Sequence, residues 1–302
     1  MPFKTTKIWI RAARLRTLPL SISGVIVGNA LCVQQANFSW LLFVLMLLTA
    51  VTFQIVSNLA NDYGDGVKGT DNAGRIGPER VLQSGLLSRQ ALKKGIVGVA
   101  LVSLLLALIL ITAAFGSNSW MYFLIFLGLA IFSIWAAISY TVGDKAYGYR
   151  GLGDVFVFVF FGLVSVMGAY FLQLKEFSLA AVAMAVVVGL LSVAVLNLNN
   201  MRDRESDAAV GKRTLAVLLG ALGAKYYHYF LIGGAVVILI VFSVQQTVSF
   251  SWLVGLGVFP LLFHLLSVIK NKDAKTLDPE LKKVALATFA LSLLIFISYS
   301  LG

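Results

Sequence analysis

Charged residues are scarce in this sequence. Asp, Glu, Lys and Arg together make up 12% of its 302 residues, whereas an ordinary globular domain contains about 25%. Hydrophobic residues make up 59%, and the mean hydropathy is +0.91. This composition excludes an ordinary soluble domain and predicts a polytopic membrane protein.

Cysteine and histidine are nearly absent as well. The single cysteine, Cys32, excludes an intramolecular disulfide. The two histidines, His228 and His264, lie far apart in the sequence, and we interpret them as packed residues rather than metal ligands. The candidate site residues therefore come from the carboxylates, the amides and the basic side chains.

Nine apolar stretches are each long enough to cross a bilayer as a helix. They lie at about residues 17–35, 39–58, 94–115, 119–141, 152–172, 179–199, 224–245, 250–269 and 282–301. We predict an all-α integral membrane protein with nine transmembrane helices, forming a single membrane-embedded domain over residues 1–302. Residues 1–16 mix basic and apolar side chains, which is typical of a helix lying in the membrane interface.

The basic residues predict how the chain crosses the membrane. With nine spans, every one of the 24 Lys and Arg residues except Lys175 falls on one side. Because Lys and Arg accumulate in cytoplasmic loops, we predict a cytoplasmic N-terminus and an external C-terminus. The net charge of +11 then reflects topology and contact with membrane lipid, and we expect no nucleic-acid partner.

The first candidate site begins where the second apolar stretch ends. If that helix continues, Asn58, Asp62 and Asp65 stand at i, i+4 and i+7, and Asn61 and Asp65 form a second i, i+4 pair. A glycine-rich segment containing Asp71 follows, and its alternative interpretation is a flexible linker. The spacing of an EF-hand calcium loop is missing. Carboxylates and amides at a membrane helix end are costly to bury and indicate a functional site.

The end of the sixth apolar stretch repeats this pattern. Asn200, Asp203 and Asp207 stand at i, i+3 and i+7, which places them on one helical face. The two acidic groups together would repel one another and any phosphate. Divalent cations between them remove both repulsions, and oxygen ligands of this kind suit a hard cation such as Mg²⁺.

Basic residues close to both motifs supply further positive charge for an anion. The candidates for contact with a diphosphate are Lys68, Arg75, Arg80, Lys145 and Lys212. Metal ions and cationic side chains together stabilise a departing diphosphate. At the mouth of an apolar helical bundle, such a site predicts a diphosphate that carries a long hydrocarbon tail and is ionised at its C–O bond.

Two short motifs resemble those of a known family. N-D-x-x-D, from Asn61 to Asp65, and D-x-x-x-D, from Asp203 to Asp207, are similar to the aspartate motifs of the UbiA superfamily of membrane-embedded aromatic prenyltransferases. The longer strings YTVGDKAYGYRGLGD and NNMRDRESDAAVGKRTLAV resemble the branch that acts on 1,4-dihydroxy-2-naphthoate in menaquinone biosynthesis. The resemblance runs from RLRTLP to beyond residue 220. The chain departs from the wider family pattern at Gly69, where a third aspartate is common, and carries Asp71 two residues later.

The resemblance implies nine transmembrane helices around a Mg²⁺-dependent site. It implies transfer of a polyprenyl group from polyprenyl diphosphate to 1,4-dihydroxy-2-naphthoate, with loss of CO₂, to give demethylmenaquinol. We expect a multi-pass protein of the bacterial cytoplasmic (inner) membrane with its active site facing the cytoplasm. The alternatives are a UbiA-type enzyme with another acceptor, such as 4-hydroxybenzoate, and a membrane transporter.

The resemblance also assigns roles to residues. The expected metal ligands are Asn58, Asn61, Asp62, Asp65, Asp71, Asn200, Asp203 and Asp207. The expected catalytic residues are Asp62, Asp65, Asp203, Asp207 and Tyr140. Of these, Tyr140 is expected to orient the acceptor or to stabilise the allylic cation.

Overall fold

The structure is a computed structural model that describes residues 2–70, 76–116, 119–245 and 252–302. Within these ranges every regular element is helical. The elements are α1 (Pro2–Ala13), η1 (Leu15–Thr17), α2 (Leu18–Ala30), α3 (Trp40–Lys68), α4 (Arg89–Phe115), α5 (Trp120–Ser139), η2 (Tyr147–Tyr149), α6 (Gly153–Val157), η3 (Phe158–Met167), α7 (Gly168–Leu174), α8 (Leu179–Arg202), α9 (Arg204–Ala209), α10 (Leu215–Gln245), α11 (Trp252–Lys270), η4 (Ala274–Leu277) and α12 (Asp278–Leu301).

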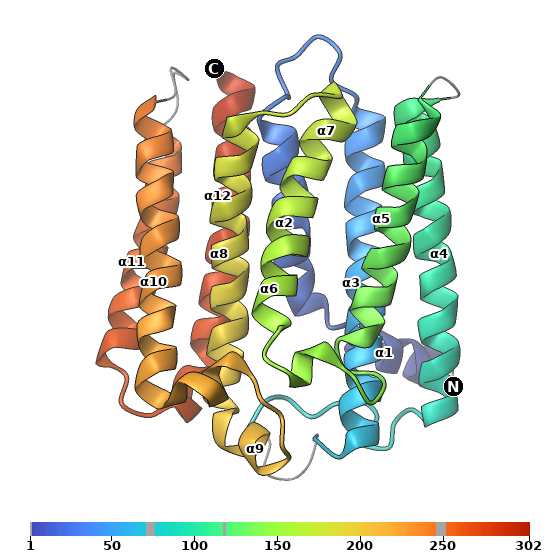
Figure 1. Ribbon diagram of the computed structural model, residues 1–302, viewed down its shortest axis with the longest axis vertical. Helices are drawn as coiled ribbons and strands as arrows, with labels where there is room; N and C mark the ends of the chain where they lie inside the picture. The colour runs from blue at the N-terminus through green and yellow to red at the C-terminus, as the bar shows by residue number, and fades with distance from the viewer. Residues whose placement is uncertain (1, 71–75, 117–118, 246–251) are drawn as a thin grey trace.

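The long helices run side by side along one axis (Figure 1). Among the described residues, eight segments are long and apolar enough to cross a membrane. They correspond to eight of the nine predicted spans. The remaining span is represented by α2, which has 13 helical residues and is followed by turns, fewer than the roughly 20 that a full crossing needs.

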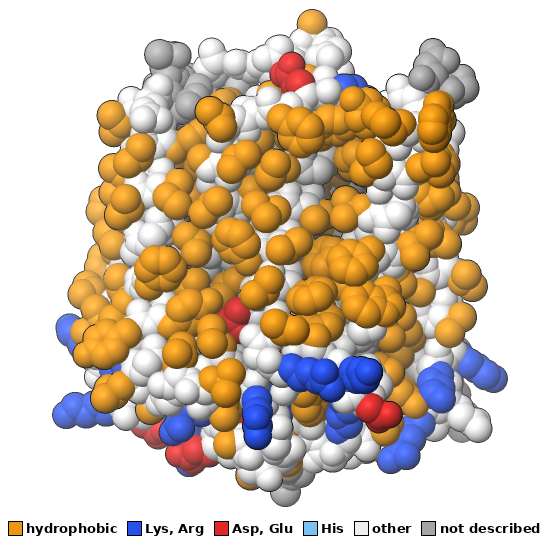
Figure 2. Space-filling model, viewed as in Figure 1, with side chains coloured by type: hydrophobic (Ala, Val, Ile, Leu, Met, Phe, Trp, Pro, Cys, Tyr) orange, Lys and Arg blue, Asp and Glu red, His pale blue; other side chains and the backbone are white. Residues whose placement is uncertain are grey.

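Charge is distributed unevenly along this axis. Lys and Arg side chains gather at the end that carries α1 and α9, and hydrophobic side chains cover most of the remaining visible face (Figure 2). The segregation agrees with the sequence, in which the basic residues fall into alternate loops.

Capping residues mark both ends of α3, the helix that carries the first motif. The Ser39 hydroxyl accepts a hydrogen bond from the Leu42 backbone N–H at the start of α3. The helix ends only at Gly69, whose φ of 73° is the left-handed conformation that favours glycine. The predicted continuation of the helix beyond residue 58 is therefore confirmed.

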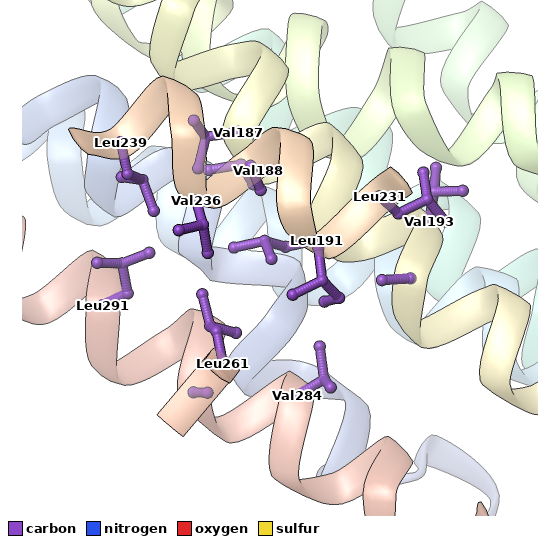
Figure 3. Packing of buried hydrophobic residues seen from close by; sticks show 14 of the residues in the cluster. Val187, Val188, Leu191, Val193, Leu231, Val236, Leu239, Leu261, Val284 and Leu291 are labelled. Carbon is purple, nitrogen blue, oxygen red and sulfur yellow. The ribbon is translucent and has the colours of Figure 1, made fainter. Parts of the chain in front are cut away.

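The main hydrophobic core joins α8, α10, α11 and α12 (Figure 3). Leu191, Leu231, Leu261 and Val284 contribute one fully or nearly fully buried side chain from each of these helices. α2 and the π-helix η3 contribute Val27 and Val166 to the same core and pack tightly against each other. A Cβ atom added at Gly28 would lie 2.3 Å from the Val166 carbonyl oxygen, so glycine is what permits this approach.

The two histidines form a buried pair that ties three helices together. The Nε2 atoms of His228 in α10 and His264 in α11 lie 2.8 Å apart. The carboxylate of Glu280 in α12 lies 2.7 Å from His264 Nδ1 and also pairs with Lys283. Because the carboxylate accepts from Nδ1–H, neutral His264 accepts at Nε2 from His228. The interpretation as packed residues agrees with this burial, although their pairing was not predicted.

A His264→Leu variant is expected to lower the free energy of unfolding by about 1–3 kcal/mol, because it leaves buried polar groups of His228 and Glu280 unpaired. The measurement is thermal unfolding in detergent. Ser267→Ala is the control, since this exposed α11 hydroxyl donates to the Phe263 carbonyl of its own helix rather than to another helix. Equal shifts for the two variants would contradict the role of the pair.

Candidate active site

The two aspartates of the first motif are buried on α3 and held by different partners. Asp65 accepts a hydrogen bond from the Tyr149 hydroxyl at Oδ1 and pairs with Arg80 at Oδ2, both at 2.7 Å. Asp62 Oδ2 accepts from the Val81 backbone N–H at 3.2 Å, whereas its Oδ1 is buried and has no hydrogen-bond partner among the described residues. The segment after α3 thus folds back onto the motif.

The two asparagines of this motif face different neighbours. The Asn58 amide donates to the Ala13 carbonyl at 2.8 Å and to the Thr17 hydroxyl at 3.0 Å, so it fastens the N-terminal segment to α3. The Asn61 side-chain oxygen accepts from the Thr141 hydroxyl at 3.3 Å. Its backbone carbonyl accepts from Arg80 at 2.7 Å. Only Asn61 also lines the cavity described below.

The second motif is not on one continuous helix, so that prediction was wrong. α8 ends at Arg202, and Asp203, with φ −94° and ψ 7°, joins it to α9. At this break the Arg202 guanidinium donates to both oxygens of Asp203, at 2.9 and 2.6 Å, and also pairs with Asp278 of α12. The predicted ligand Asn200 is buried one turn before Asp203.

Asp207 resembles Asp62, because one of its carboxylate oxygens has a partner among the described residues and the other has none. Its Oδ1 pairs with Lys212 at 3.2 Å, and its buried Oδ2 has no partner in the described part of the chain. Burial raises the pKa of Asp207, the Lys212 ammonium opposes this, and the negative charges of Asp203 and Asp65 raise the pKa further. Asp65 belongs to the first motif, so its electrostatic effect on Asp207 indicates that the carboxylates of the two motifs lie near one another.

Tyr149 connects the two motifs directly. Its hydroxyl donates to Asp65, and the ammonium groups of Lys68 and Lys212 lie 4.1 and 5.6 Å from the centroid of its ring. Burial raises the pKa of Tyr149, as does the nearby Asp65 carboxylate, so the hydroxyl keeps its proton and acts as a donor. Sequence reasoning missed this residue, because a tyrosine in a polar loop carries no distinguishing signal.

An apolar cavity of about 350 Å³ opens beside the motifs. Asn61 and Tyr140 line it at one end, and Met46, Phe126 and Leu172 line it further along the helices. Met46 and Asn61 are fifteen residues apart on α3, which corresponds to about 22 Å at 1.5 Å per residue. The cavity can therefore hold a long hydrocarbon chain whose polar end lies at the motifs.

Tyr140 caps the end of α5 at the polar end of the cavity. Its carbonyl accepts from the Gly148 N–H at 3.0 Å, and its ring meets that of Tyr147 edge-on, with centroids 5.3 Å apart. Lys145, in the same loop, is exposed, and the structure describes no contact between it and either motif. The predicted Asp71 and Arg75 lie outside the described residues.

The polar groups fit a hard divalent cation. The described residues include no three His, Cys, Asp or Glu side chains already grouped to hold a metal ion. Within the two motifs, one buried carboxylate oxygen on Asp62 and one on Asp207 nevertheless have no hydrogen-bond partner among the described residues, which is costly for groups of this kind. Mg²⁺ uses one or two protein carboxylates together with substrate phosphates, and this donor set matches that requirement.

The sequence matches one family model over most of its length. The description of that model is the UbiA prenyltransferase family, and residues 21–289 are matched. The chain belongs to the UbiA prenyltransferase family. The resemblance inferred from the two aspartate motifs is thereby confirmed.

Curated UbiA-family relatives cover nearly the whole chain. A protein of Haemophilus influenzae named 1,4-dihydroxy-2-naphthoate octaprenyltransferase is 42% identical, over 98% of this chain and 95% of the relative. An Escherichia coli protein of the same name is 41% identical, over 96% and 94%. A Mycobacterium tuberculosis protein of that name is 35% identical, over 92% of each chain.

Solved structures agree with the UbiA fold. A UbiA homolog from Archaeoglobus fulgidus, bound to DMAPP and Mg²⁺, superposes with a TM-score of 0.70 at 16% identity, covering 97% of this chain and 99% of the homolog. A homolog from Aeropyrum pernix gives a TM-score of 0.67 at 15% identity, over 95% and 98%. These similarities support the fold of the chain.

Close packing at Gly64 keeps the first motif of this UbiA site beside the α5 end. A Cβ added at Gly64 would lie 2.5 Å from the Thr141 hydroxyl and 2.7 Å from the Thr141 backbone carbon. A Gly64→Ala variant is therefore expected to displace α3 and to reduce prenyl transfer at least about tenfold, since an ångström-scale misplacement has effects of this size or larger. Gly98→Ala is the control, because nothing lies within 4 Å of its added Cβ. Equal activity of the two variants would contradict this account.

Proposed function

We propose that this protein transfers a polyprenyl group from polyprenyl diphosphate to 1,4-dihydroxy-2-naphthoate, releasing CO₂ and diphosphate and giving demethylmenaquinol. The observation that carries the proposal is the meeting of both aspartate motifs around Tyr149 and Lys212 beside an apolar cavity. The names of the Haemophilus influenzae and Escherichia coli relatives supply the acceptor and the prenyl donor class.

We assign Mg²⁺ as the cofactor. Asp62 and Asp207 would bind it through the carboxylate oxygens that have no partner within the described ranges. The remaining predicted ligands would bind the cation directly or through water, and they are Asn58, Asn61, Asp65, Asp71, Asn200 and Asp203. When bound, the cation neutralises charge on the departing diphosphate. The Mg²⁺ in the Archaeoglobus fulgidus homolog supports this assignment.

The basic side chains would hold the diphosphate end of the donor. Lys68 and Lys212 already converge at Tyr149, and Arg80 lies against Asp65. The predicted Arg75 and Lys145 would complete this positive lining. Their charges favour ionisation because the negative charge on the leaving group increases as the C–O bond breaks.

The bond changes balance without a base from the protein. The allylic C–O bond breaks and its electron pair leaves with the diphosphate. The allylic carbon then bonds to the ring carbon that bears the carboxylate, CO₂ departs, and the electrons of that broken C–C bond restore the aromatic ring. Tyr140, at the polar end of the cavity, would orient the acceptor or face the allylic cation.

In this proposal, residues 1–302 act as one domain of the bacterial inner membrane. The end rich in Lys and Arg faces the cytoplasm with the active site and the N-terminus, and the C-terminus is external. α2, together with its flanking turns, serves as the first of nine crossings. α1 lies in the interface against membrane lipid.

The test is incubation of the purified protein with Mg²⁺, a polyprenyl diphosphate and a panel of acceptors, with products identified by mass spectrometry. The panel contains 1,4-dihydroxy-2-naphthoate and 4-hydroxybenzoate. We expect prenylated, decarboxylated product from the naphthoate and at most traces from the benzoate. Preferential prenylation of the benzoate would refute the acceptor assignment. If the prenyl donor released no diphosphate with any acceptor, the reaction class would be refuted.

A further inference from the structure

We propose that Tyr149 is a positioning residue for the diphosphate end of the substrate, because its hydroxyl fixes the Asp65 carboxylate while its ring gathers Lys68 and Lys212. The inference rests on the proposed function and extends it to a residue outside both aspartate motifs. Tyr149 belongs to the short helix η2, between α5 and α6.

The hydroxyl determines how Asp65 is oriented. It donates to Oδ1 at 2.7 Å while Arg80 pairs with Oδ2 at the same distance, so a partner on each oxygen prevents the carboxylate from rotating. The Thr70 hydroxyl also hydrogen-bonds to the Tyr149 hydroxyl. Thr70 lies just beyond the end of α3, so Tyr149 bonds both to the first motif and to the segment that follows α3. A residue that orients a metal-binding carboxylate in this way typically affects metal affinity.

The Tyr149 ring lies close to two ammonium groups, each from a residue that follows one of the two motifs. Lys68 comes from the last turn of α3, and Lys212 follows α9 and pairs with Asp207. Both ammonium groups lie within the roughly 6 Å over which an aromatic face attracts a cation. Two like charges repel one another, and the attraction of each ammonium group to the Tyr149 ring offsets part of that cost. A diphosphate is an anion that could accept hydrogen bonds from both.

The backbone around Tyr149 is fixed from both sides. Its carbonyl accepts from the Arg213 N–H at 3.1 Å, which connects it to the segment after α9. The preceding Gly148 donates to the Tyr140 carbonyl, and a Cβ there would lie 2.6 Å from that oxygen. Tyr149 is therefore held between the segment after α9 and the end of α5. A change in its side chain is for this reason expected to affect both lysines.

Two variants separate the contributions of the hydroxyl and the ring. Tyr149→Phe keeps the ring and removes the donor to Asp65, whereas Tyr149→Leu removes both. The probes are Mn²⁺ binding followed by electron paramagnetic resonance and binding of inorganic diphosphate in the presence of Mg²⁺. Both use the purified protein without an aromatic acceptor, so they remain informative if the acceptor assignment fails. Tyr226→Leu, an exposed tyrosine of α10, is the matched control.

We expect Tyr149→Phe to weaken Mn²⁺ binding by about tenfold while diphosphate affinity changes less than about twofold, because the cation–π contacts persist. We expect Tyr149→Leu to weaken diphosphate binding by about tenfold as well, and to raise KM for the prenyl diphosphate more than it lowers kcat. Equal diphosphate affinity in the two variants would overturn the role of the ring. Unchanged Mn²⁺ affinity in Tyr149→Phe would overturn the role of the hydroxyl, and this isosteric variant decides alone if Tyr149→Leu does not fold.

Discussion

An Asp207→Asn variant is expected to retain its fold but to lose prenyl transfer by about a hundred- to a thousandfold, a loss that single electrostatic contributions to a transition state produce. The change preserves shape while removing the charge that a hard cation requires. Asp207 is the informative position because one of its buried oxygens has no partner in the part of the chain that the structure describes. The measurement is turnover at saturating Mg²⁺ together with thermal unfolding in detergent.

The chain supplies a matched control two residues earlier. Glu205 belongs to the same short helix α9, but its side chain is 66% exposed and pairs with Lys275 at the surface. Glu205→Gln is expected to change turnover less than about twofold, since surface ion pairs contribute little. If Asp207→Asn retained near-normal activity over an EDTA-controlled Mg²⁺ range, its assignment as a metal ligand would be wrong.

The structure also explains why Asp65→Asn and Asp203→Asn are less direct tests. Arg80 holds Asp65, and Arg202 holds Asp203 at two atoms. Both oxygens of these two carboxylates are engaged, so removing either charge breaks two interactions, at least one of them with a largely buried guanidinium, and is more destabilising than loss of the single Asp207–Lys212 pair. A loss of activity in those variants would combine structural and catalytic effects.

The features predictable from the sequence were those that depend on local periodicity. Hydropathy located the helices because a membrane crossing requires a long apolar run, and the i, i+4 and i+7 spacing placed Asp62 and Asp65 on the buried side of α3. The short helix α2 differs from its predicted span because turns begin at Leu31. Apolar composition does not reveal where a helix ends inside an apolar stretch.

The features that could not be predicted are contacts between distant segments. Where the helix carrying the second motif breaks, Arg202 bonds to Asp278, 76 residues away in the chain. Tyr149 reaches Asp65 across 84 residues. No local spacing rule encodes such a contact, because its formation depends on how helices pack. The same reason explains why the sequence did not predict the contact between His228 and His264.

A Lys212→Met variant is expected to raise KM for the prenyl diphosphate by about tenfold or more, because a charge-assisted hydrogen bond contributes about 1.5–3 kcal/mol and each 1.36 kcal/mol is a factor of ten. Lys212 lies against Asp207 and over the ring of Tyr149, where the diphosphate is expected. KM for the naphthoate should change much less, because the acceptor carries no diphosphate. Steady-state kinetics with each substrate varied in turn measures both constants, and Lys270→Met, at the end of α11, controls for the loss of an exposed basic charge. An equal rise in both constants would mean that Lys212 supports the site as a whole rather than the donor end alone.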